Sequence, residues 1–348
     1  MKRVLLTGAT TPLGAGLTRR LLGRDDVSLV VAVARPGEMP PVGIDDGRFV
    51  FVNADLTRSR EVRNVLWGPA KRANALVLAA HHRSVRTVGR QARLLNVETT
   101  RMMLNMAERH PHLERVVYRS FGDVYRVDSK QPAMMDEYHP INLDPRAPQW
   151  IRDRVEADLM VSTRTGLSPL DITVLRFSPT LARGMGSQLY DFLDAPVCFT
   201  PIGFDPILNV IDLRDMVRAI DKALESDVEG IFNIPGRDTL AMSDAIRRFG
   251  KRQFGVPGPV LSRLYRARAR LVGGEFDFEL NRGRFHWNGV LDGRRADNEL
   301  GFVPHHGIPW PVGGSLRESS LSPTSLDPEA SPSSPPETET SPPIKLVR

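Results

Sequence analysis

The sequence contains very little cysteine and no long apolar segment. Its 348 residues include a single cysteine, Cys198, so an intramolecular disulfide is excluded and a disulfide-stapled secreted domain is not expected. No run of about 18 or more apolar residues occurs, which excludes a predicted membrane-spanning helix. The first residues also lack the pattern of a secretory signal peptide. We therefore expect a cytoplasmic protein.

Positive charge is only slightly in excess over negative charge. The formal net charge is +6. Segment 315–348 is net acidic, which leaves about +8 on the remainder and favours anionic ligands such as dinucleotides. No nucleic-acid-binding motif accompanies these charges, so nucleic acid is not an expected partner. No cluster of cysteine and histidine has the spacing of a metal site, so no metal is expected either.

Short apolar runs alternate with helical patterns over the first half of the chain. The predicted strands are 3–7, 29–34, 49–52, 76–80, 115–119 and 172–177. One predicted helix follows the first strand and ends at about residue 22, and the others span 60–66, 92–109 and 150–164. Continuous apolar strands separated by amphipathic helices are typical of a parallel sheet covered on both faces. The expected fold class is α/β, a doubly wound Rossmann sheet with a small C-terminal substrate lobe.

The domain boundaries follow from where this alternation loosens. Residues 1–180 are predicted to form the dinucleotide-binding domain, with its sheet completed by about 209–235. Residues 181–208 are rich in glycine and proline and are expected to be loop, joining residues 236–314 in the small lobe. Residues 315–348 are dominated by Ser, Pro, Thr and Glu, so we expect a disordered tail there.

A glycine-containing turn lies between the first predicted strand and the first predicted helix. Gly8 permits a tight turn, and Gly14 permits close packing of the helix on the strand. The amides at the start of the helix are then free to meet a pyrophosphate. The middle position holds Thr11 where glycine is usual, and its hydroxyl is able to donate to a phosphate. The same pattern also fits a plain strand–turn–helix without a ligand.

The end of the second predicted strand bears on the choice of cofactor. An acidic residue about 20 residues beyond the loop normally binds the ribose hydroxyls. Ala34 stands at that place and Arg35 follows, which favours a 2′-phosphate and hence NADP over NAD. A solvated Arg35 at the end of a strand is the open alternative.

Several segments, in order, resemble the extended short-chain dehydrogenase/reductases, the group that contains the NAD-dependent epimerases and dehydratases. The resemblance runs from about residue 1 to 311 and includes the glycine loop, an adenine-contacting turn, the strand end beneath the cofactor, the strand end that bears the catalytic serine and the segment that closes on the nicotinamide. Taken residue by residue, it implies a cofactor site of Gly8, Thr11, Leu13, Gly14, Arg35, Asp55, Leu56, Ala79, Ala80, Arg154 and Pro179, with Ser120 as the catalytic serine.

The catalytic pair of this family is missing from the corresponding helix. The family uses a tyrosine and a lysine four residues apart, which lie on one helix face and move a proton while a hydride is transferred. Trp150 stands at the tyrosine position and Arg154 at the lysine position. An indole N–H is only a donor, so Trp150 cannot act as an acid or base. Arg154 retains the charge and is able to contact the ribose.

Two interpretations of this altered site remain open. One is an NAD(P)-binding oxidoreductase that acts on a nucleotide sugar or another carbonyl or alcohol, with Tyr125, Tyr138 or His81 as the proton donor. The other is a catalytically inactive protein that senses the cofactor or serves as a scaffold. The expected partners are a dinucleotide and a small-molecule substrate of unknown identity, and a homodimer is a further open alternative.

Overall fold

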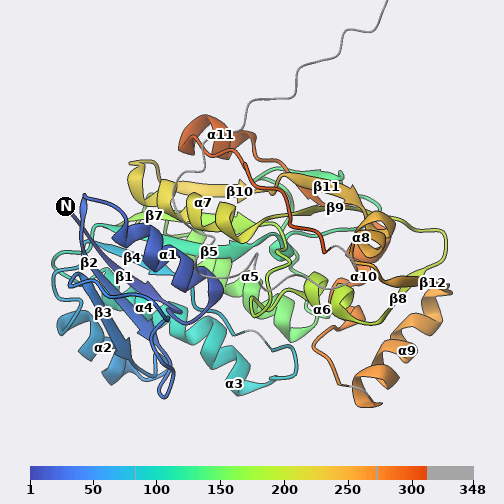
Figure 1. Cartoon of the computed structure of the whole chain (residues 1–348), viewed down its shortest axis with the longest axis horizontal. Helices are drawn as coiled ribbons and strands as arrows, with labels where there is room; N and C mark the ends of the chain where they lie inside the picture. The colour runs from blue at the N-terminus through green and yellow to red at the C-terminus, as the bar shows by residue number, and fades with distance from the viewer. Residues whose placement is uncertain (83, 272, 312–348) are drawn as a thin grey trace, which may run out of the picture.

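A seven-stranded parallel sheet forms the centre of the molecule (Figure 1). The computed structural model describes residues 1–82, 84–271 and 273–311, so the predicted tail at 315–348 lies outside the described residues. The strand order is β10-β7-β5-β4-β1-β2-β3, and every neighbouring pair is parallel. The strands are β1 (Lys2–Thr7), β2 (Val27–Ala34), β3 (Phe49–Asn53), β4 (Ala75–Leu78), β5 (Arg115–Phe121), β7 (Asp171–Phe177) and β10 (Gly230–Ile234). This arrangement confirms the predicted α/β Rossmann class.

Helices cover both faces of the sheet, which explains why its strands are apolar on both sides. On one face lie α1 (Pro12–Leu22), α7 (Leu213–Glu225) and α11 (Arg294–Leu300); on the other lie α2 (Ser59–Trp67), α4 (Thr99–Ala107) and α5 (Gln149–Ser162). Along β1, Leu6 packs toward the first group and Leu5 toward the second, as the alternation of side chains in a strand requires.

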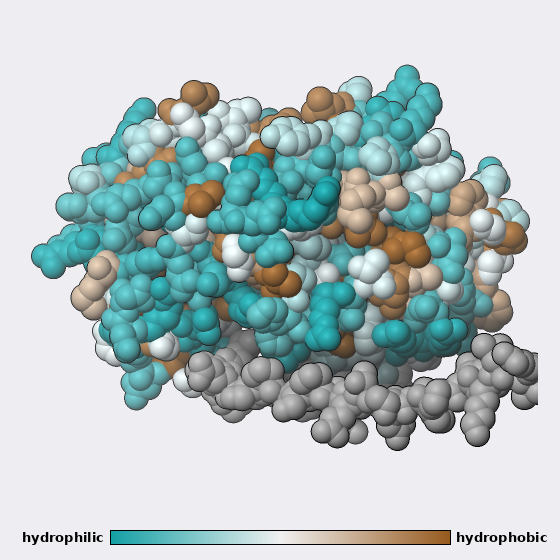
Figure 2. Space-filling model, turned by 90° about the horizontal axis from the view of Figure 1, so that it is seen from above, coloured by the Kyte–Doolittle hydropathy of each residue, from teal (hydrophilic) through white to brown (hydrophobic). Residues whose placement is uncertain are grey.

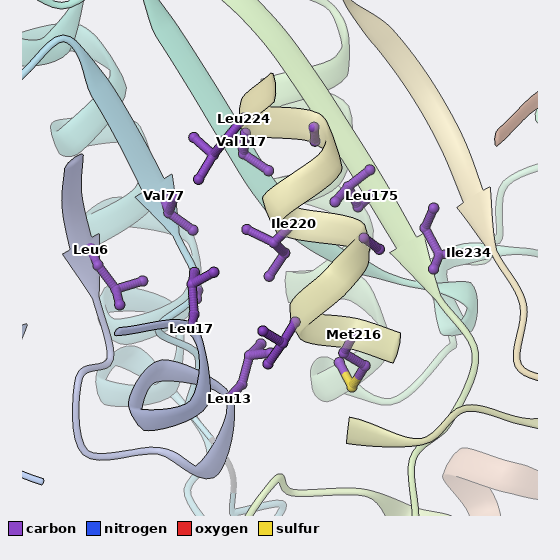
Figure 3. Packing of buried hydrophobic residues seen from close by; sticks show 14 of the residues in the cluster. Leu6, Leu13, Leu17, Val77, Val117, Leu175, Met216, Ile220, Leu224 and Ile234 are labelled. Carbon is purple, nitrogen blue, oxygen red and sulfur yellow. The ribbon is translucent and has the colours of Figure 1, made fainter. Parts of the chain in front are cut away.

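The core between the sheet and its first helical layer joins consecutive strands to α1 and α7. Figure 3 shows one side chain from each of five strands, Leu6, Val77, Val117, Leu175 and Ile234, on the side where the two helices pack. Leu13 and Leu17 of α1 and Met216, Ile220 and Leu224 of α7 pack against them. This packing therefore fixes the start of α1 at the carboxyl edge of the sheet, where β1 ends.

The predicted helix at 92–109 is interrupted. The structure has α3 (Arg90–Arg93), a π-helical turn η1 (Leu94–Glu98) and α4 in succession. Asn96 lies on that turn, and its Oδ1 accepts a hydrogen bond of 3.2 Å from the His82 amide, which fastens the chain that follows β4. Such π turns often occur at functional sites.

A smaller lobe lies beside the carboxyl edge of the sheet (Figure 1, right). It contains α6 (Gln188–Asp194), β8 (Val197–Pro201), β9 (Ile207–Val210), β11 (Asp238–Ala241), α8 (Met242–Arg248), β12 (Arg252–Val256), α9 (Gly258–Leu271) and α10 (Phe278–His286), and the short strands β6 (Met134–Met135) and β13 (Val290–Leu291) pair with each other nearby. Its core is aromatic, with the rings of Phe192 and Phe285 4.8 Å apart and those of Tyr265 and Phe278 stacked at 5.8 Å.

The expectation that 181–208 is loop was wrong in part, since α6, β8 and the start of β9 lie within it. Strand β8 pairs in parallel with β12, and β9 pairs antiparallel with β11, so both depend on partners that are distant in sequence. Of the segment 209–235, α7 and β10 belong to the main sheet layers, whereas the residues of β9 belong to the lobe.

The face of the molecule seen in Figure 2 is mostly hydrophilic, with hydrophobic side chains in small separate patches. Among the described residues, no helix combines the length and the apolar character needed to cross a bilayer. No group of three or more His, Cys, Asp or Glu residues that could hold a metal ion is found in the described part of the chain either.

Candidate active site

The turn between β1 and α1 has no room for side chains at its two key glycines. Gly8 has a φ of 81°, and a Cβ there would lie 3.1 Å from the Cα of Ala80. A Cβ on Gly14 would lie 2.1 Å from the carbonyl oxygen of Gly8. Helix α1 therefore begins directly against the end of β1, and its first amides face the carboxyl edge of the sheet. Gly8 thus permits the tight turn and Gly14 the close packing of the helix on the strand, whereas their part in binding a cofactor stays a prediction.

Thr11 is the N-cap of α1. Its Oγ accepts a hydrogen bond of 3.0 Å from the Gly14 amide, and its hydroxyl donates to the Gly8 carbonyl oxygen at 2.8 Å. The hydroxyl proton is thus committed to the loop, which differs from the expectation that it would donate to a phosphate. Leu13 is fully buried and lies outside the lining of the loop cavity, so the predicted contact with the cofactor would have to come from its backbone amide in the first helical turn.

A cavity of about 700 Å³, counting its open mouth, lies over this turn; we call it the loop cavity. Its lining includes the predicted residues Gly8, Thr11, Arg35, Asp55, Leu56 and Ala80. Ala79 is not among them, because successive residues at the end of β4 point in opposite directions and Ala79 is buried in the core. The structure thus brings together, around one cavity, residues that follow four different strands.

Two acidic groups border the loop cavity. Asp55 accepts hydrogen bonds from the Thr57 hydroxyl at 2.6 Å and the Thr57 amide at 3.1 Å, and these bonds lower its pKa below the usual value. Glu38 accepts from the Thr10 hydroxyl at 2.6 Å and lies 3.6 Å from the guanidinium of Arg35. The cation that we expected to favour a 2′-phosphate therefore has a carboxylate beside it in the same cavity.

A second cavity, of about 830 Å³ including its mouth, lies between the sheet edge and the lobe; we call it the lobe cavity. Its lining contains Arg119, Phe121 and Asp123 from the end of β5 and the 3₁₀ turn η2 (Gly122–Val124) that follows, Arg154 from α5, and Pro179 after β7. Helix α10 contributes Arg284, whose side chain donates a hydrogen bond of 2.6 Å to the Gly122 carbonyl oxygen.

The family of the chain follows from a comparison with known protein families. Residues 4–195, more than half of the chain, match the model of the NAD dependent epimerase/dehydratase family. The chain belongs to this family. It is 29% identical over 315 residues to the uncharacterized protein Rv0501 of Mycobacterium tuberculosis, with 87% of this chain and 80% of that protein covered. The uncharacterized protein Mb0513 of Mycobacterium bovis matches to the same extent.

Solved structures of epimerases and dehydratases share the fold. The UDP-glucose 4-epimerase of Thermotoga maritima, solved with UDP-glucose, has a TM-score of 0.66 at 14% identity and covers 88% of this chain and 94% of its own. DesIV, a dTDP-glucose 4,6-dehydratase of Streptomyces venezuelae solved with NAD and TYD, has a TM-score of 0.66 at 19% identity and covers 88% and 93%. At these identities the likeness shows the fold alone.

The epimerase/dehydratase resemblance implies a serine at the end of β5, but the structure turns Ser120 away from the lobe cavity. Ser120 is buried, and its hydroxyl donates to Asp158 of α5. Asp158 in turn forms a buried ion pair of 2.5 Å with Arg176. Because side chains alternate along a strand, the neighbours Arg119 and Phe121 face the cavity instead. Ser120 therefore holds α5 against β5 and lies outside the lining of the lobe cavity, and its catalytic role stays a prediction.

Trp150 and Arg154 lie on one face of α5, as their spacing predicts. The guanidinium of Arg154 lies 4.1 Å from the centroid of the Trp150 ring and 3.7 Å from that of Phe121. It also pairs with Asp123 at 2.5 Å. Trp150 is buried, and its indole N–H has no hydrogen-bond partner among the described residues. Burial lowers the pKa of Arg154 to about 10, which leaves it charged at neutral pH.

The three alternative proton donors do not lie free at the site. The Tyr125 hydroxyl donates to Asn233 at 2.8 Å and accepts from Arg176 at 2.9 Å, and burial raises its pKa to about 12. Tyr138 is 90% exposed and lies outside the lining of both cavities. His81 lines the loop cavity, but its Nε2 lies 2.7 Å from the Arg119 carbonyl oxygen, and burial lowers its pKa well below the ordinary value.

Among the lining residues that sequence reasoning missed are Glu38, Arg119, Phe121, Asp123 and Arg284. Arg119 and Phe121 could have been found, because they flank Ser120 at the end of the predicted strand 115–119, and a strand continued to residue 121 puts both on the side opposite to Ser120. Arg284 reaches the site from α10, and no local pattern indicates that position.

Proposed function

We propose that the chain binds a nicotinamide dinucleotide in the loop cavity and acts as an epimerase/dehydratase-like oxidoreductase with an altered active site. The turn at Gly8 and Gly14 carries this proposal, because the absence of a Cβ at both positions lets α1 begin directly against the end of β1, with its first amides at the carboxyl edge of the sheet. Helix amides in that position are suited to a pyrophosphate. The substrate we propose is a nucleotide sugar or another carbonyl or alcohol, bound in the lobe cavity beside the sheet edge.

The chain's own residues would hold the cofactor along the carboxyl edge of the sheet. The amide of Leu13 would face the phosphates, Asp55 and Leu56 would flank the adenine, and Pro179 would close on the other end. When bound, the dinucleotide supplies hydride transfer at its nicotinamide ring. Ala80 lines the loop cavity beneath this path, whereas Ala79 supports it from the core.

Because Trp150 stands where the family has its tyrosine, another group must transfer the proton. Trp150 has only a donor N–H, and Arg154 remains protonated while it is paired with Asp123. Asp123 is the single carboxylate among the described residues that line the lobe cavity. It is therefore the group we propose to accept or return a proton there. Its pairing with Arg154 means that substrate must displace or share one carboxylate oxygen.

The test is a binding and turnover measurement on the purified chain. We expect titration with NADH or NADPH to show energy transfer from tryptophan, and a panel of carbonyl and alcohol substrates to show slow redox turnover that Asp123→Asn abolishes. Absence of dinucleotide binding at millimolar concentration would contradict the proposal. Exposed Asp45→Asn is the matched control and should leave binding and turnover unchanged.

The second candidate is a cofactor-binding sensor or scaffold without turnover, and the burial of Trp150 beneath Arg154 favours it. A triple variant, Trp150→Tyr, Arg154→Lys and Phe121→Ser, separates the two. If the wild type binds cofactor and stays inert while the variant gains turnover, the protein is a binding protein that lost its proton relay. If the wild type itself turns over, the sensor candidate is wrong.

A further inference from the structure

The lobe cavity holds an excess of positive charge. Its described lining residues include three guanidinium groups, those of Arg119, Arg154 and Arg284, and one carboxylate, that of Asp123. The three arginines come from separate elements, β5, α5 and α10, and Asp123 lies on η2, so the tertiary fold brings them together. No histidine or lysine is found among the described lining residues.

One carboxylate serves two of these arginines. Oδ2 of Asp123 lies 2.5 Å from Arg154, and Oδ1 lies 3.5 Å from Arg284. The third guanidinium, of Arg119, lies 4.7 Å from the centroid of the Phe121 ring, the same ring that Arg154 approaches to 3.7 Å. A single phenyl ring thus borders two cations, and its quadrupole offsets only a small part of their charge.

Two of these cations are withdrawn from water, whereas the side chain of Arg284 is 20% exposed. Arg119 is 5% exposed and Arg154 is 8% exposed. Burying a charge is costly unless an opposite charge compensates it, and a partly neutralised cluster is destabilising for the free protein. Burial also depresses the pKa of Arg154, although the nearby Asp123 carboxylate acts in the opposite direction. A bound anion would restore the balance.

We propose that the lobe cavity binds its substrate through a carboxylate or phosphate group held by Arg154 and Arg284, beside the place where the reaction would occur. The planar guanidinium fork matches both kinds of oxyanion, with two parallel hydrogen bonds from each arginine. This inference rests on the proposed function, because it names the substrate class of the same cavity. Phe121 and the partly exposed Trp287 provide apolar lining for the rest of the molecule.

The two variants of this site should act in opposite directions. Arg284→Gln removes one cation, so the affinity for an oxyanion should fall about tenfold or more. Asp123→Asn removes the competing carboxylate, so affinity should rise about three- to tenfold. Exposed Arg282→Gln, on the same helix and outside the lining, is the matched control and should bind like the wild type.

The experiment is isothermal titration of the full chain with inorganic phosphate and with oxalate at constant ionic strength, with chloride as the reference anion. The protein is first saturated with NAD, so that binding at the start of α1 is blocked. Equal phosphate affinity in the wild type and Arg284→Gln would overturn the proposal. If Arg284→Gln does not fold by circular dichroism, Asp123→Asn decides, and unchanged or weaker binding in that variant overturns it.

Failure of the proposed function can be recognised separately. NAD titration of Arg284→Gln should still show binding that Gly14→Ala abolishes, because the pyrophosphate is proposed to bind in the loop cavity and Arg284 lies outside it. If NAD does not bind, the phosphate titration is run without it. Binding that still depends on Arg284 then supports an anion site, while the dinucleotide proposal fails. If NAD binds but the binding of phosphate and oxalate does not depend on Arg284, the dinucleotide proposal stands and the anion site fails.

Discussion

At the scale of single residues, Gly8 and Gly14 are the two positions of the β1–α1 turn at which the packing excludes a side chain. We predict that Gly14→Ala abolishes dinucleotide binding and costs about 1–3 kcal/mol of stability, because its Cβ would lie 2.1 Å from the Gly8 carbonyl oxygen. Urea unfolding and NADH titration measure the two effects. Gly47→Ala is the control, since a Cβ there would meet no atom within 4 Å. Wild-type binding by Gly14→Ala would contradict the prediction.

The second prediction at this scale concerns Arg35 and Glu38, which both line the loop cavity. The sequence suggested NADP from Arg35, and the structure sets Glu38 beside it at 3.6 Å. Because a carboxylate repels a 2′-phosphate and accepts bonds from ribose hydroxyls, Glu38→Gln should raise the ratio of NADP to NAD affinity about tenfold. Arg35→Gln should lower the same ratio. Titration of each variant with both cofactors measures this ratio, and movement of both variants in one direction would refute the assignment.

At the scale of elements, α5 is held to the sheet by a buried polar network rather than by apolar contacts alone. Asp158 accepts from Ser120 of β5 and pairs with Arg176 of β7. Asp158→Asn would leave the buried Arg176 without a compensating charge, at a cost of about 3–5 kcal/mol. Ser120→Ala removes one hydrogen bond, at a cost of about 1–2 kcal/mol.

Denaturant unfolding of the two variants tests this ranking. Ser120→Ala should also leave phosphate binding in the lobe cavity unchanged, because the serine hydroxyl faces α5. A large loss of ligand affinity in Ser120→Ala, with little loss of stability, would restore Ser120 to the catalytic role that the sequence implied.

The prediction on pH dependence concerns Asp191 of α6. Burial, with Glu275 and Asp194 nearby, raises the pKa of Asp191 to about 6, compared with a usual value of 3.8. A raised folded-state pKa means that stability is highest below the unfolded value and is lost as the pH rises through about 6. Asp191→Asn removes this loss, so the variant should exceed the wild type in stability at pH 8 by more than at pH 5. Asp45→Asn, an exposed control, should show no such pH-dependent gain in urea unfolding.

The sheet could be predicted from the sequence, because buried parallel strands are continuous apolar runs such as Leu29–Ala34 that need no knowledge of their partners. The lobe could not, since β8 forms only where β12 pairs with it. The candidate site divides in the same way. Gly8 and Gly14 are local features, whereas the meeting of Asp123 with Arg284 depends on packing between the lobe and the sheet.

At the scale of the whole molecule, the sheet and the lobe have separate cores, and the lobe cavity lies between them. The sheet buries its apolar residues against α1, α7 and the helices of the opposite face, while the lobe has an aromatic cluster of its own. Separate cores permit separate unfolding steps. The loop cavity is built by the sheet and its connections alone, whereas the lobe cavity takes Arg154 from α5 and Arg284 from α10. A ligand in each should therefore stabilise a different part of the chain.

This difference gives the last prediction, which calorimetry can test. A dinucleotide at about 100 times its Kd stabilises the folded state by about 2.7 kcal/mol, so the Tm of the sheet should rise by roughly 5 °C. Phosphate in the lobe cavity should raise the transition of the lobe as well, because it holds α10 to α5. In Gly14→Ala the first shift should vanish and the second remain, and in Arg284→Gln the reverse should hold. If both ligands raise one common transition in both variants, the two cavities do not act as separate sites, since each shift must depend on the residues that line its own cavity.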